Sequence, residues 1–307
     1  MPPSDDSYTH QKIAYLHMLW ASVSFAVMAA VSHWAGQRCD WQLVAVARAS
    51  IAFFFSVIIA KASSVKLVIL GPRTLWMRSL AGSTGILCNF YALSRLPVSD
   101  TLTLMNTSPI WVTLILWFIF KQKPTTGIVI AVLTSVAGIV LIQQPHFQSG
   151  KFACFMALCG SFCTSIAMIG LNRLQSIDPR AIVAHFSGVA SVATAAFLTL
   201  TSNKDYSAQL SGAPILFLLV LVGLAGVAGQ LGMTLAFAKG QASRVSVVAL
   251  SQILFGLIFE AIFLRRTVNT VSLLGMIFVT VPTAWLIISG ATASSGSGDL
   301  VAVELKD

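Results

Sequence analysis

The sequence predicts an all-α membrane protein with ten transmembrane helices, arranged as two inverted repeats of five helices each. Three observations support this fold class. Hydrophobic residues make up 56% of the chain and charged residues only 9%, the apolar residues gather in long runs, and the second half repeats a pattern of the first. A bilayer core of roughly 30 Å needs about 20 helical residues to cross it. Long apolar runs without alternation indicate helices rather than barrel strands.

The apolar runs are separated by short charged or helix-breaking segments, and these breaks define the expected spans. Reading the runs in order predicts helices at residues 13–34, 41–60, 75–94, 98–120, 126–142, 152–171, 180–200, 214–238, 243–263 and 268–288. The boundary between the third and fourth helices rests on Arg95, Leu96 and Pro97.

The two ends of the chain are polar and carry no predicted span. Residues 1–11 contain two aspartates and no early basic cluster, so we expect a disordered cytoplasmic segment rather than a cleaved signal peptide. Residues 290–307 are rich in serine and glycine and predict a disordered cytoplasmic tail. Between them, residues 12–143 and 151–289 are the expected repeats, which leaves no room for a soluble domain.

Basic residues predict the orientation of the chain. Leaving out Arg48, which lies within a span, twelve Lys and Arg fall on the side of the N-terminus and six on the other side. Arg78 and Arg244 are counted among the twelve. Because basic residues favour cytoplasmic loops, we expect a multi-pass protein of the inner cell membrane with both termini in the cytoplasm. The formal charge of +9 is explained by these topology signals, so we expect no nucleic-acid partner.

The repeat is visible in the sequence itself. Residues 91–99 (YALSRLPVS) align with residues 235–243 (LAFAKGQAS) at an offset of 144, and two glycines upstream, Gly82 and Gly85, fall on Gly226 and Gly229. Because each repeat crosses the membrane five times, the second repeat enters from the opposite side. Transporters built in this way hold their solute near the midplane, between the repeats.

Arg48 is the candidate with the clearest chemistry, because it lies deep within the second span. A charge at the centre of a bilayer costs about 2.5–3.5 kcal/mol on insertion scales and normally faces a polar interior. Arg48 is expected either to bind an anionic group of a solute or to hold the bundle together through helix-end carbonyls. His185, close to the equivalent position of the seventh span, is either a cavity residue or a helix-packing residue.

Other polar or aromatic residues within spans are candidates for solute contact. They come from the first, third, fourth, eighth and ninth helices and comprise Trp20, Asn89, Tyr91, Asn106, Gln230 and Gln252. Interhelical hydrogen bonding is the alternative role for the polar members of this set. A second set is expected to act in gating or packing: Pro109, which loosens the fourth helix, Gly226 and Gly229 in a glycine run, and Glu260.

The sequence contains no pattern typical of an enzyme or a metalloprotein. The HExxH, GxSxG and P-loop motifs are absent, and the five cysteines show no metal-ligand spacing. We therefore expect no enzymatic activity, no cofactor and no bound metal. The expected partners are a small organic solute and the lipid bilayer, with the chain a monomer or a homodimer.

Several of these segments resemble the drug/metabolite transporter superfamily, specifically its EamA-type ten-helix transporters. The resemblance covers nearly all of residues 12–289 and rests on VAVAR at residues 44–48, on Arg78 with residues 96–99, on Ser108-Pro109 and on AGIVL at residues 137–141. Residues 90–97 (FYALSRLP) are also similar to the branch related to solute carrier family 35 group G. Gln122 and Arg266 stand where members often carry a glutamate.

The resemblance implies a transporter of small organic metabolites, commonly an exporter, that alternates between inward-open and outward-open states. Because the one charge predicted near the midplane is positive, we expect an anionic, zwitterionic or amphipathic solute. An arginine at the position of Arg48 is common in the family, which favours a general structural or gating role for it. A non-transporting scaffold or regulatory membrane protein is the alternative function.

Overall fold

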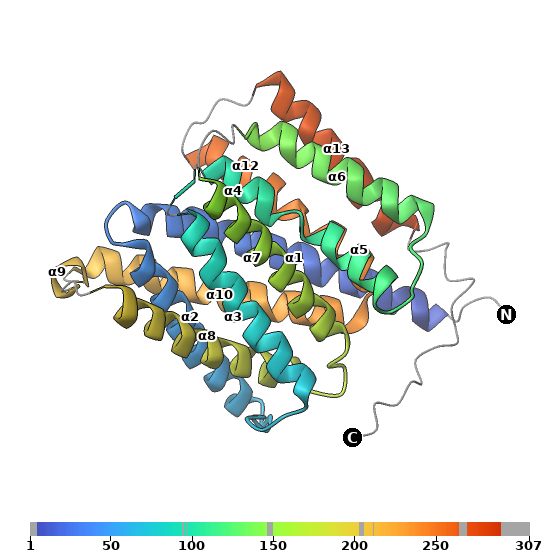
Figure 1. Cartoon of the computed structure of the whole chain (residues 1–307). Helices are drawn as coiled ribbons and strands as arrows, with labels where there is room; N and C mark the ends of the chain where they lie inside the picture. Colours follow the sequence, from blue (N-terminus) through green and yellow to red (C-terminus); the bar gives the residue numbers. More distant parts are fainter. Residues whose placement is uncertain are drawn as a thin grey trace.

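The structure, a computed structural model, describes residues 5–93, 95–96, 98–145, 150–202, 206–210, 212–263 and 269–289. Throughout these ranges it is helical with short connections (Figure 1). In order, the helices are α1 (Asp5–Gly36), α2 (Trp41–Ala62), α3 (Arg73–Leu93), α4 (Val98–Met105), α5 (Ser108–Phe118), α6 (Thr126–Gln143), α7 (Lys151–Asn172), α8 (Pro179–Thr201), α9 (Ser207–Leu210), α10 (Ala213–Lys239), α11 (Ala242–Ala249), α12 (Ser251–Phe263) and α13 (Thr270–Ser289).

Among the described residues, nine helical segments are long and apolar enough to cross a membrane, with α4–α5 and α11–α12 each counted as one segment. The tenth, α3, has 21 residues and is more polar. Its polar side chains Arg78, Ser79 and Ser83 are buried. Because neighbouring helices cover them, α3 can lie in a membrane without an apolar surface all round. The predicted fold class is confirmed.

Most helices pack chiefly against a helix of the other repeat. The largest contacts join α1 to α10, α3 to α7, α2 to α8 and α6 to α13. Figure 1 shows the last pair side by side at one edge of the molecule. If each helix is replaced by its counterpart in the other repeat, α1 becomes α7 and α10 becomes α3, so the α1–α10 pair becomes the α7–α3 pair. The same replacement leaves the α2–α8 and α6–α13 pairs unchanged. The protein interior is therefore the interface between the repeats.

The fourth and ninth predicted spans correspond to the membrane-length segments Asp100–Phe118 and Ala242–Phe259, and each is built from two helices. The breaks occur at Asn106–Thr107 and at Leu250, and the offset of 144 places Asn106 on Leu250. In the first repeat the physical cause is Pro109, which has no N–H to donate to the carbonyl four residues earlier. The second repeat breaks at the equivalent position without a proline.

Side chains stabilise several helix ends. Asp178 accepts a hydrogen bond from the Arg180 backbone N–H at 2.8 Å at the start of α8, where Pro179 occupies the first turn. Asn269 Oδ1 accepts from the Ser272 N–H at 2.8 Å and also from Gln144 Nε2 at 3.1 Å. The start of α13 is thus tied to the end of α6, on which it packs.

Three sequence expectations need correction or fall outside the structure. Residues 5–11 form the first turns of α1 rather than a disordered segment. Arg78 and Arg244, counted as loop cations, lie inside α3 and α11 with only 1% and 7% of their surfaces exposed, because helix packing covers positions that the sequence places near span ends. The expected tail, 290–307, lies outside the described residues.

Glycines allow two pairs of helices to approach closely. Along α10, a Cβ at Gly229 would lie 2.6 Å from the Phe25 ring of α1, and one at Gly232 would lie 2.9 Å from the His17 carbonyl oxygen. Between α6 and α13 the approach is reciprocal. A Cβ at Gly138 would lie 2.7 Å from the Gly275 carbonyl oxygen, and one at Gly275 would lie 2.6 Å from that of Gly138. These backbones touch where a larger residue would separate them.

Candidate functional site

Arg48 lies at the interface between the repeats, beside the middle of α10. A Cβ at Gly226, the central residue of the 27-residue helix α10, would be 3.7 Å from both Cγ and Nε of Arg48. The Arg48 Nε–H donates to the Met28 sulfur at 3.0 Å. A thioether is a weak acceptor. The side chain is partly exposed, so the guanidinium group keeps donors available to a solute.

A second arginine, Arg78 of α3, contacts α10 one helical turn beyond Gly226. The sequence did not suggest it as a site residue. Arg78 is the largest fully buried side chain in the described part of the protein. Its Nη2 donates to Gln230 Oε1 at 3.1 Å, and its guanidinium carbon lies 3.8 Å from the centroid of the Phe186 ring. Its Nε and Nη1 have no hydrogen-bond partner among the described residues. The sequence signal was present, because Arg78 lies three residues inside the predicted third span.

Two of the predicted site residues, Gln230 and His185, lie next to this arginine. Gln230 bonds to it directly. His185 Nδ1 shares a hydrogen bond with Ser79 Oγ at 2.8 Å, and Trp76 packs edge-on against its ring at 4.7 Å between centroids. His185 Nε2 is buried and has no partner in the described structure. Residues from α3, α8 and α10 thus bring imidazole, amide and guanidinium groups together inside the protein.

The other predicted site residues do not join this cluster. Asn89 lies against Gly160 of α7, where its buried Oδ1 has no partner in the described structure. Tyr91 lies near the end of α3, with its ring edge-on to Phe152 at 5.7 Å. Trp20 contacts Gly232 and is 61% exposed. Asn89 and Tyr91 thus lie between α3 and α7, and Trp20 lies between α1 and α10.

Three further predicted residues lie at or near the two helix breaks. Asn106 Nδ2 donates back to the Leu102 carbonyl at 2.7 Å, which keeps the end of α4 closed. Pro109 is buried in the first turn of α5. Gln252 is half-buried just after the Leu250 break. Glu260 lies in α12, and its side chain is outside the described structure.

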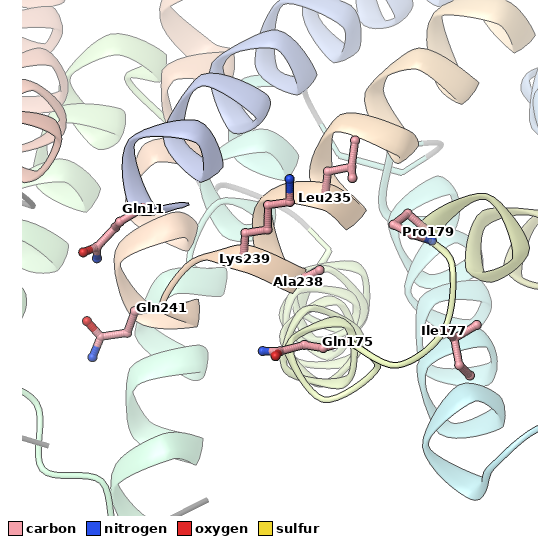
Figure 2. A pocket seen from close by; sticks show the side chains of 8 residues that line it. All are labelled: Gln11, Gln175, Ile177, Pro179, Leu235, Ala238, Lys239 and Gln241. Atoms are coloured by element: carbon pink, nitrogen blue, oxygen red, sulfur yellow. The ribbon is translucent and has the colours of Figure 1, made fainter. Parts of the chain in front are cut away.

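A pocket of about 700 Å³, lined by both polar and apolar side chains, opens at the end of the molecule where α1 begins. Figure 2 shows its lining side chains, which come from the start of α1, the segment joining α7 to α8, the end of α10 and the start of the next connection: Gln11, Gln175, Ile177, Pro179, Leu235, Ala238, Lys239 and Gln241. The sequence predicted none of these as site residues. The signal that could have found them is that three glutamines and Lys239 fall at span ends on the same predicted side.

The equivalent positions at the opposite end of the molecule are occupied by aromatic contacts. The offset of 144 relates Leu235 and Lys239 of the pocket to Tyr91 and Arg95. Tyr91 packs on Phe152, and the Arg95 guanidinium carbon lies 5.8 Å from the centroid of the Tyr91 ring. Nearby, Trp41 stacks on Phe90 at 5.7 Å and contacts Phe197 at 6.1 Å. Rings therefore pack at these positions, whereas the related positions at the other end line a pocket.

Two repeats of membrane helices, broken helices at matching positions and intramembrane cations at the repeat interface define a class of multi-pass membrane protein typical of solute transporters. Comparison with known families agrees. The EamA-like transporter family matches the chain twice, over residues 12–144 and 151–288. The chain belongs to this family, which confirms the predicted membership of the drug/metabolite transporter superfamily.

Individual relatives are distant. Solute carrier family 35 member G1 of Homo sapiens is 24% identical over 64% of this chain and 58% of its own length. The pseudopaline exporter CntI of Pseudomonas aeruginosa is 22% identical over 88% of this chain and 94% of its own length. A solved structure titled "Crystal structure of protein" superposes with a TM-score of 0.77 at 14% identity, over 91% of this chain and 96% of that one. That likeness shows the fold alone.

Proposed function

We propose that this transporter moves a small anionic or zwitterionic organic solute across the membrane by alternating access, as an exporter or exchanger. The observation that carries the proposal is Arg48, a partly exposed cation between the repeats whose hydrogen-bond acceptor is the sulfur of Met28. A guanidinium group forms two parallel hydrogen bonds with a carboxylate or phosphate, which a thioether cannot replace. The exporter CntI supports the outward direction, because its alignment covers most of both chains.

The experiment that tests the function compares metabolites in cells that do and do not express the chain. An exporter of an organic anion is expected to lower the internal level of one or a few anions and to raise their level in the medium. An expressing strain that carries Arg48→Ala is the control for indirect effects of a membrane protein. Identical anion profiles in all three cultures would contradict the proposal and would favour a non-transporting scaffold.

We further propose that the pocket at the start of α1 is the cytoplasmic vestibule of an inward-open state. Three considerations support this proposal. Four of the eight pocket residues are polar, the majority of loop cations lie on the same predicted side, and the related positions at the other end are packed with aromatic rings. In this state the solute would enter from the cytoplasm past Gln11, Gln175 and Gln241. Packing of Tyr91 on Phe152 and of Trp41 on Phe90 and Phe197 would keep the outer side closed.

Cysteine labelling checks this orientation and state together. In a variant whose five native cysteines are replaced by serine, Gln175→Cys is expected to react with a membrane-impermeant maleimide in inside-out vesicles and not in intact cells. Tyr91→Cys is expected to be protected in both preparations. Arg38→Cys, in the exposed connection between α1 and α2, is the matched control and should react from the outside. Labelling of Gln175→Cys in intact cells would show that the proposed orientation is wrong.

A further inference from the structure

We infer that Arg78 and Gln230 form a second acid-binding subsite, and that the transported solute therefore carries two acidic groups. One would be held by Arg48 and the other by Arg78. This inference rests on the anion transport proposed above and makes it more specific. Three observations support it. Two nitrogens of Arg78 have no hydrogen-bond partner in the described structure, no described carboxylate forms an ion pair with Arg78, and Arg78 and Arg48 contact neighbouring turns of α10.

Arg78 has more hydrogen-bonding capacity than the protein uses. A guanidinium group carries five N–H donors. Gln230 accepts one, the Phe186 ring covers one face, and Nε and Nη1 are left without partners in the described structure. Leaving a buried donor unmet costs about 1–3 kcal/mol, and more when the group is charged. Nη2 also keeps one hydrogen beyond the one that Gln230 accepts, so an acidic group of a solute would accept from Nη2 together with Nε or with Nη1, in the paired geometry that arginine favours for carboxylates.

Neither arginine is neutralised by the protein. Within the described part of the chain, no carboxylate lies within ion-pairing distance of Arg48 or Arg78. The ion pair found among the described residues joins Arg180 to Asp178, near the start of α8. Breaking up a buried ion pair by removing one partner typically costs 3–5 kcal/mol because a lone buried charge remains. Arg78 is such a buried charge, and Arg48 is a second, partly exposed one beside it. A solute with two negative charges would compensate both of them at once.

The two arginines contact α10 at positions one helical turn apart. Arg48 lies against Gly226 and Arg78 bonds to Gln230, and these α10 residues are four positions apart, which is one helical turn and about 6 Å along the axis. Phe186 connects the two places, since its ring faces Arg78 and packs in the same cluster as Ala49, the neighbour of Arg48. Both guanidinium groups therefore belong to one region of the repeat interface.

The local packing is adapted to hold Arg78 in this place. A Cβ at Gly82 would lie 2.8 Å from Phe186, and a Cβ at Gly170 would lie 3.0 Å from the Arg78 Cβ. Any larger residue at either position would displace the arginine or the ring beneath it. The base of the Arg78 side chain thereby packs on α7, and its guanidinium group packs on the Phe186 ring of α8.

The test measures binding of dicarboxylates and of their monoamides to the purified full-length protein. Succinate, glutarate and adipate are each compared with the monoamide of the same length, at constant ionic strength, and affinity is obtained from thermal stabilisation. With two subsites, the best dicarboxylate is expected to bind at least tenfold more tightly than its monoamide. Equal binding of a dicarboxylate and its monoamide at every length would overturn the second subsite while leaving the anion site at Arg48 intact.

Variants assign the difference to Arg78. In Arg78→Gln the ratio between dicarboxylate and monoamide is expected to fall to about one, with binding of the monoamide retained. Arg38→Gln, which removes an exposed arginine, should keep the native ratio. A native ratio in Arg78→Gln would overturn the assignment. If Arg78→Gln does not fold, Arg78→Lys keeps the charge without the paired donors and should lower the ratio. Failure of every anion to bind the native protein would overturn both this inference and the proposed function.

Discussion

Replacing Arg48 by alanine is expected to reduce transport about 100-fold or more while leaving the protein folded. A hydrogen bond to a charged group contributes about 1.5–3 kcal/mol, and two such bonds to one acidic group exceed the roughly 2.7 kcal/mol that corresponds to a factor of 100. Folding should be little affected, because the protein gives the Arg48 side chain only a sulfur acceptor and leaves it partly exposed.

The measurement is the initial rate of uptake into proteoliposomes, below saturation, of the anion that the metabolite comparison identifies. Arg48→Lys keeps the charge but not the planar pair of donors and is expected to lose about tenfold. Lys61→Gln, at the exposed end of the same helix, is the matched control and should transport at the native rate. A normally folded Arg48→Ala protein with native transport would remove Arg48 from the solute site.

The second large effect is expected on stability, at the contact between α6 and α13. In Gly138→Ala the new methyl group would lie 2.7 Å from the Gly275 carbonyl oxygen, which is backbone and cannot rotate away. The two helices must separate, and overpacking of this kind typically costs about 1–3 kcal/mol. We expect a thermal midpoint in detergent that is lower by several degrees.

Gly256→Ala provides the matched control, because a Cβ at Gly256 would meet no atom within 4 Å. Alanine favours a helix over glycine by up to about 1 kcal/mol, so this variant should be as stable as the native protein or slightly more stable. Gly275→Ala should repeat the effect of Gly138→Ala, and the double variant should lose less than the sum since both methyl groups act on one contact. Equal midpoints for Gly138→Ala and Gly256→Ala would contradict the importance of this approach.

The membrane fold could be predicted from the sequence because length and hydrophobicity of a span are local properties. The offset of 144 found from residues 91–99 and 235–243 also aligns the two helix breaks, at Asn106 and Leu250. The breaks themselves were not predicted. Pro109 indicates the first, but no residue near Leu250 is a helix breaker, so the second depends on contacts that the sequence does not display.

The site was predicted less completely, for a related reason. Arg48 was found because it stands alone in the middle of an apolar run. Arg78 was counted with the loop cations although it lies just inside the predicted third span, and only the packing of Phe186, Gly82 and Gly170 around it shows that it is interior. Similarly, the glutamines of the pocket come from three distant segments. Their proximity is a property of the folded chain.

The sequence by itself determined that the chain lies in a membrane, that it has two related halves and that Arg48 is a costly internal charge. These follow from the transfer of residues between water and lipid, which each residue feels independently of its distant neighbours. Only the tertiary structure decided which helices meet, that Arg78 joins Arg48 beside α10, and that Gln11, Gln175 and Gln241 line one pocket. Those features arise from contacts between segments far apart in the chain, and such contacts exist only after the helices have packed.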